Sequence, residues 1–73
     1  MFTLYAISVG GRTRLQIGSA HADRAIVTCW LEQLQRDLQQ TYPGYAYDWT
    51  DDRELLTVTR PNGKRTAYFV DTI

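Results

Sequence analysis

The chain opens on two short segments of apolar and β-branched residues joined by a pair of glycines. The first segment runs from Phe2 to Val9 and the second from Thr13 to Ile17, with Gly10-Gly11 between them. In the second segment Arg14 and Gln16 alternate with apolar or β-branched positions, which assigns one face to a core and the other to solvent. Glycine readily adopts the positive φ that a two-residue hairpin turn needs. The pattern therefore predicts a β-hairpin.

After this hairpin the apolar spacing changes to that of a helix. The region from about His21 to Thr41 contains one stripe of apolar residues at roughly 100° per residue. The stripe consists of Val27, Trp30, Leu31, Leu34 and Leu38. Ser19 or Asp23 is a candidate N-cap, and Pro43-Gly44 is expected to end the helix. We expect one long helix whose stripe packs on the sheet.

Three more β-rich segments follow the helix. They run from Tyr45 to Thr50, from Leu55 to Thr59 and from Thr66 to Val70. Turn residues separate them, namely Asp51-Asp52 and then Asn62-Gly63, a pair that is a strong hairpin signal. The predicted fold is α+β: a single antiparallel sheet, β-β-α-β-β-β, with one long helix packed on one face. We expect residues 1–73 to form a single domain.

A sheet covered by one helix leaves its opposite face open to water or to a partner. Side chains alternate along a strand, so each strand turns only one set of residues to the helix. One consistent assignment turns Ala67 and Phe69 to the helix and leaves Tyr68 and Val70 on the open face.

Aromatic residues occupy alternate positions in the segment after the helix, at Tyr45, Tyr47 and Trp49. These rings share a face of the strand and admit two interpretations. They complete a core that is short of aliphatic residues, or two or three of Tyr5, Tyr47, Trp49 and Tyr68 form an exposed surface of the kind that anchors protein interfaces. The sequence leaves both open.

Composition argues against several classes of function. Eight basic and eight acidic side chains cancel, so the overall field that drives non-specific nucleic-acid binding is missing. One cysteine, Cys29, and one histidine, His21, are too few for a disulfide or for a structural zinc site. Neither has a predictable catalytic partner. We therefore expect no catalytic residue, no cofactor and no metal, and a protein that is not an enzyme.

Hydropathy also bears on location. No apolar run approaches the roughly 20 residues that span a bilayer, and Met1 to Tyr5 lacks a basic segment followed by an apolar one. We expect a cytoplasmic protein with no membrane partner.

Charged residues gather at the two turns between the last three segments. The carboxylates around Asp51-Asp52, flanked by aromatic rings, suit a basic protein partner and would exclude nucleic acid from it. The basic residues around Asn62-Gly63 suit phosphates or acidic side chains, although charged turns are also common as solvated surface. The candidate partner-binding residues are Tyr47, Asp48, Trp49, Asp51, Asp52, Glu54, Arg60, Lys64 and Arg65.

The predicted helix carries a second, weaker surface away from its apolar stripe. Ala22, Ile26 and Cys29 lie on it, and small residues allow another helix to approach closely. A homodimer through these residues is one expectation. The other is that Ile26 lies at the boundary of the core and Cys29 is a half-buried small hydrophobe.

The layout as a whole resembles several small phage and mobile-element proteins, among them anti-CRISPR inhibitors. The segments that carry the likeness are Thr13 to Ile17, running through Ser19 into the helix, and the hairpin from Arg60 to Arg65. The resemblance implies an inhibitor that binds a CRISPR surveillance complex through surface contacts, without catalysis or a cofactor. Such inhibitors share few residues with one another, so no functional residue is transferred.

We expect the partner to be a protein subunit of a nucleic-acid-handling complex. The alternative is a small nucleic-acid-binding module that uses sheet aromatics and the basic hairpin.

Overall fold

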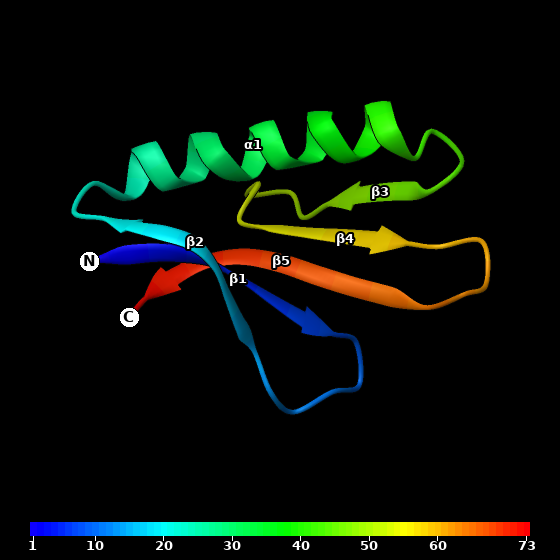
Figure 1. The fold of residues 1–73 in the computed structure, drawn as a ribbon, viewed down its shortest axis with the longest axis horizontal. Coiled ribbons are helices and arrows are strands. Elements are labelled where there is room, and N and C mark those ends of the chain that lie inside the picture. The colour runs from blue at the N-terminus through cyan, green and yellow to red at the C-terminus, as the bar shows by residue number, and fades with distance from the viewer.

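The computed structural model describes residues 1–73 and contains five strands and one helix in the predicted order. The strands form a single antiparallel sheet, and the helix lies along one side of it (Figure 1). The predicted α+β fold is therefore confirmed. The elements are β1 (Phe2–Ser8), β2 (Leu15–His21), α1 (Arg24–Thr41), β3 (Ala46–Trp49), β4 (Leu55–Thr59) and β5 (Arg65–Thr72).

The sheet has the strand order β2-β1-β5-β4-β3. The first and last strands of the chain are neighbours inside the sheet, where β1 pairs with β5 from Phe2↔Thr72 to Ser8↔Thr66. The β1–β2 hairpin extends the sheet on one side, and the β3–β4–β5 meander extends it on the other. As a result, the two ends of the chain lie side by side (Figure 1), with the Ile73 N–H donating to the Met1 carbonyl at 3.2 Å.

The connection from β1 to β2 is longer than the predicted two-residue turn. β1 ends at Ser8 and β2 begins only at Leu15. The Gly11 N–H donates to the Ser8 carbonyl at 2.7 Å, and Gly10 between them has a φ of +90°. The glycine pair thus makes the predicted reversal, but the residues that follow it do not pair at once.

β2 also continues beyond its predicted end at Ile17, as far as His21. Its register with β1 shifts after Ile17 and leaves residues 18–20 opposite Thr3. The Thr3 side chain is fully buried and its hydroxyl donates to the Ser19 carbonyl at 2.9 Å. This long-range bond supports an irregular strand where the sequence indicated a break.

Because β2 includes His21, α1 begins later than predicted, at Arg24. Asp23 is the N-cap, and its carboxylate accepts a hydrogen bond from the first turn at 2.9 Å. The helix ends at Thr41, just before Pro43-Gly44, as expected. No helix here combines the length and the apolar character needed to cross a membrane.

The predicted stripe of α1 forms the core with the sheet. Val27 and Leu31 are fully buried, and Trp30, Leu34 and Leu38 pack beside them. The sheet contributes the buried side chains of Leu4, Leu56, Val58 and Val70.

The face predicted for β5 is wrong. Tyr68 and Val70 pack on the core beneath the helix, whereas Ala67 and Phe69 lie on the open face. Both sets of β5 side chains are apolar, so alternation alone does not distinguish them. The register decides, because Tyr68 is paired with Leu56, whose side chain is fully buried under α1.

Candidate functional site

The face of the sheet opposite α1 has an apolar centre. We call it the open-face patch and define it as Tyr5, Ile7, Leu55, Ala67 and Phe69. Strand pairing places these side chains together, because Tyr5, Phe69 and Leu55 are neighbours across β1, β5 and β4, and Ile7 is paired with Ala67. None of them belongs to the cluster under the helix. The patch is therefore a second apolar surface, in which Tyr5 and Ala67 are buried and Ile7, Leu55 and Phe69 are half-buried.

Tyr5 is the most buried aromatic residue of this patch, with 7% of its surface exposed. Its ring stacks on that of Phe69, with centroids 5.8 Å apart, and the Arg14 guanidinium lies 4.0 Å above its centroid. Arg14 in turn donates to the Asp71 carboxylate at 2.7 Å, which holds the pKa of Asp71 below its usual value. The Tyr5 ring is consequently enclosed, which leaves little of its face for a nucleic-acid base to stack on.

The aromatic residues of β3 do not form the exposed surface considered above. Tyr47 and Trp49 are half-buried on the helix side, packed against the core with Tyr45 and Tyr68. The reason is register, since Trp49 is paired with the fully buried Leu56. The set of Tyr5, Tyr47, Trp49 and Tyr68 is therefore divided between the two faces.

Tyr47 has a structural contact of its own. Its hydroxyl donates to the Tyr42 carbonyl at 2.8 Å and so links β3 to the end of α1. Partial burial, together with the neighbouring tyrosines, raises the pKa of Tyr47 above its usual value. Trp49 is partly covered from outside, because the Arg53 guanidinium lies 5.3 Å from its ring centroid.

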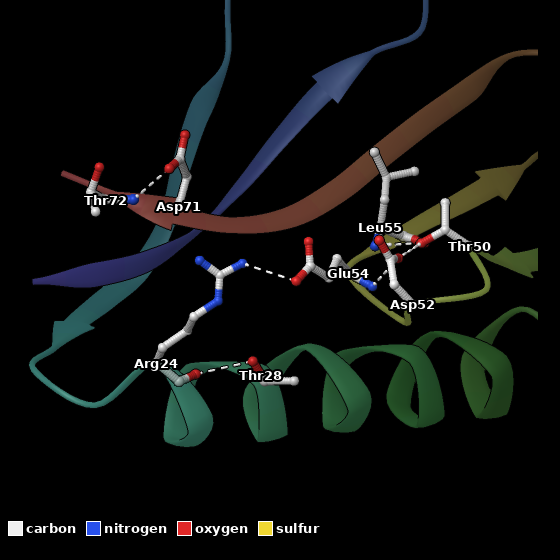
Figure 2. A network of polar contacts seen from close by, with 8 residues as sticks. All are labelled: Arg24, Thr28, Thr50, Asp52, Glu54, Leu55, Asp71 and Thr72. Atoms are coloured by element: carbon white, nitrogen blue, oxygen red, sulfur yellow. Dashed lines mark hydrogen bonds and ion pairs between the residues drawn. The ribbon is translucent and has the colours of Figure 1, made fainter.

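The acidic turn between β3 and β4 uses part of its charge internally. The Asp52 carboxylate accepts from the Thr50 hydroxyl at 2.6 Å and from the Glu54 N–H at 3.1 Å, which lowers the pKa of Asp52. Figure 2 shows Arg24 reaching from the start of α1 to Glu54, at 3.7 Å. Asp48 and Asp51 make no ion pair.

Asp48 belongs to the open face. It is paired with Thr57, which is paired with Ala67 of the open-face patch, so the three side chains form one row. Asp48 therefore lies at the edge of the patch, on the outermost strand. No group of three or more His, Cys, Asp or Glu residues is arranged to hold a metal ion.

The basic hairpin between β4 and β5 gathers its three cations around one cavity. Arg60, Lys64 and Arg65 all line this cavity of about 510 Å³, and none of them makes an ion pair. The hairpin is held by a Gly63 N–H bond to the Arg60 carbonyl at 2.9 Å. The hairpin and the acidic turn lie at opposite ends of β4, so this neutral protein has an uneven distribution of charge (Figure 1).

The remaining candidates lie on or near the helix. Cys29 is exposed, not half-buried as one expectation had it, and Ile26 is 38% exposed. The third member of the proposed dimer surface, Ala22, lies before the helix and is also exposed. His21 accepts a hydrogen bond from the Asp23 N–H at 2.9 Å and so helps to shape the start of α1.

Comparison with protein-family models, with curated proteins and with solved structures finds no match to this chain. Two regions remain available to a ligand or partner, an open sheet face edged by charges and a basic cavity at the hairpin, whereas Tyr47 and Trp49 pack against the core. Sequence reasoning did not identify Phe69 for the first region or Ser8 and Thr66 for the second. Strand pairing brings these residues into place, and no local motif marks them.

Proposed function

We propose that this chain acts without catalysis, as a stoichiometric inhibitor that binds a protein of a host nucleic-acid-handling complex. More specifically, the chain would be an anti-CRISPR-like phage protein that blocks a CRISPR surveillance complex in the host cytoplasm. The observation that carries the binding role is the open-face patch. The layout resemblance described above supports the choice of target.

The open face has the composition of a protein interface. Such interfaces have an apolar centre that includes aromatic residues, with a polar and charged rim. Here the rim includes Asp48 on β3 and Arg65 on β5, and neither makes an ion pair within the chain. A partner that covered the patch would remove Ile7, Leu55 and Phe69 from water, and this burial is the main source of affinity in such contacts.

Free carboxylates favour a basic partner. Asp48 lies at the edge of the patch and Asp51 lies in the adjoining turn, and both are exposed and without an ion-pair partner. Proteins that hold nucleic acids present basic grooves, so these carboxylates would steer association and fix orientation. The enclosed ring of Tyr5 gives less support to the alternative of a nucleic-acid module that stacks bases on the sheet.

The proposal is tested by titrating the protein into reconstituted CRISPR surveillance complexes of several types and measuring their binding to target DNA by gel shift. Inhibition should saturate at a fixed molar ratio. Ile7→Glu and Thr57→Arg place a charge or bulk in the centre of the open face, and each should weaken inhibition more than about tenfold, the size expected for an interface hot spot. Leu15→Glu changes an exposed leucine of β2 that lies in the row of Ala6 and Tyr68, away from the open face, and is the matched control.

Circular dichroism spectra must show that all three variants keep the fold. Failure of the wild-type protein to inhibit any of the complexes would contradict the choice of target. Equal inhibition by wild type, Ile7→Glu and Thr57→Arg would contradict the open face as the contact. A wild-type protein that sediments as a dimer, and becomes a monomer on Ile7→Glu, would show that a second copy covers this face instead.

A further inference from the structure

The cavity at the β4–β5 hairpin is a polar site with concentrated positive charge. It lies where the end of β1 meets the hairpin, and its volume of about 510 Å³ is within the range of small-molecule sites, roughly 300–1,000 Å³. Arg60, Lys64 and Arg65 line it together with Ser8 and Thr66, and Val9 is its one apolar residue. The cavity thus has the lining expected for an anion.

The charged and hydroxyl side chains that line this cavity have no ion-pair or hydrogen-bond partner inside the chain. The two ion pairs of the molecule join other residues, Arg14 to Asp71 and Arg24 to Glu54. The hydroxyls of Ser8 and Thr66 likewise make no hydrogen bond within the protein. Three like charges around one cavity repel one another, and an anion bound between them would relieve this repulsion.

We propose that the hairpin cavity binds a compact molecule with several phosphate groups, of the oligophosphate class. A phosphate presents three or more acceptor oxygens, so it can accept from two guanidinium groups, an ammonium and a hydroxyl at the same time. A single carboxylate has only two oxygens and satisfies fewer of these donors. The volume of the cavity also leaves room for more than one phosphate.

The placement of the cations favours a compact ligand over a nucleic-acid strand. A strand needs cations spaced along a groove and aromatic rings on which successive bases stack. Here Arg60, Lys64 and Arg65 all line one cavity, and no aromatic residue lines it. Arg65 also lies at the rim of the open face, so the test of this inference uses Arg60 and Lys64, which lie outside the open-face patch.

The test uses tripolyphosphate as the probe and nuclear magnetic resonance of the backbone amides of the full chain as the readout. Titration should give saturable shifts confined to the hairpin and to the end of β1, around Gly63, Lys64, Ser8 and Thr66. Arg60→Gln and Lys64→Gln should each weaken binding about tenfold or more, as expected for the loss of one charge-assisted hydrogen bond. Arg36→Gln removes an exposed arginine of α1 that makes no ion pair, and should leave binding unchanged.

Two further ligands complete the experiment. Citrate carries several carboxylates and should bind at least tenfold more weakly than tripolyphosphate. A single-stranded oligothymidine should also bind more weakly. The proposal is overturned if tripolyphosphate does not saturate, if Arg36→Gln weakens binding as much as Lys64→Gln, or if citrate binds equally well. Tighter binding of the oligonucleotide, weakened equally by Arg12→Gln and Lys64→Gln, would also overturn it and would assign the basic end to nucleic acid.

Discussion

Arg14 connects residues that are far apart in the chain. Its guanidinium lies over the ring of Tyr5 and donates to Asp71, which is 57 positions away in the sequence. The sequence indicated only that Arg14 points away from the core. Its partners depend on the pairing of β1 with β5, so no local pattern predicts them. By contrast, the N-cap at Asp23 depends only on the neighbouring backbone. The sequence predicted it as one of two candidate N-caps, the other being Ser19.

The contact between Arg14 and Asp71 should make stability depend on pH. The Arg14 guanidinium depresses the pKa of Asp71 below 3.8 in the folded protein. A carboxyl group whose pKa is lower in the folded than in the unfolded protein stabilises the fold. This stabilisation is present above the pKa of the unfolded protein, and it is lost as the pH falls through the pKa of the folded protein. Asp71→Asn should therefore lower the melting temperature slightly at neutral pH, since the pair is exposed. The difference from wild type should vanish in acid, and a difference of equal size at pH 2 would contradict this assignment.

At the scale of elements, the helix was the most predictable part of the fold. Its apolar stripe runs from Val27 to Leu38, about three turns, so the face that packs on the sheet follows from the sequence. The boundary between β2 and α1 was less predictable, because the long-range hydrogen bond from the buried Thr3 to Ser19 supports the strand beyond Gly18. The face of β5 was also mispredicted, since both of its faces are apolar and only pairing with β4 distinguishes them.

The buried stripe gives a direct test of the helix packing. Leu31 is fully buried between α1 and the sheet, so Leu31→Ala should lower the free energy of unfolding by about 2–5 kcal/mol. Leu15→Ala removes a leucine that is 69% exposed and should change it by less than about 0.5 kcal/mol. Urea denaturation of the two variants beside wild type measures both effects. Equal losses would show that the core is elsewhere.

At the scale of the whole molecule, the structure separates three regions that the sequence placed close together. The rings of β3 lie under the helix, the acidic turn holds Glu54 against Arg24, and the basic hairpin surrounds a cavity at the other end of β4. The apolar surface available to a partner is formed by β1, β4 and β5. Alternation predicted that an open face exists, but the strand order decided which residues occupy it.

The central claim is that the open-face patch binds a protein, and a dissociation rate tests it most directly. A CRISPR surveillance complex is immobilised, and release of wild type, Ile7→Glu and Leu15→Glu is followed by surface plasmon resonance. Loss of an apolar anchor acts mainly on dissociation. We expect wild type and Leu15→Glu to dissociate at the same slow rate and Ile7→Glu to dissociate more than about tenfold faster. No binding of wild type would contradict the choice of target, and identical dissociation rates for all three proteins would contradict the claim that the open-face patch is the contact.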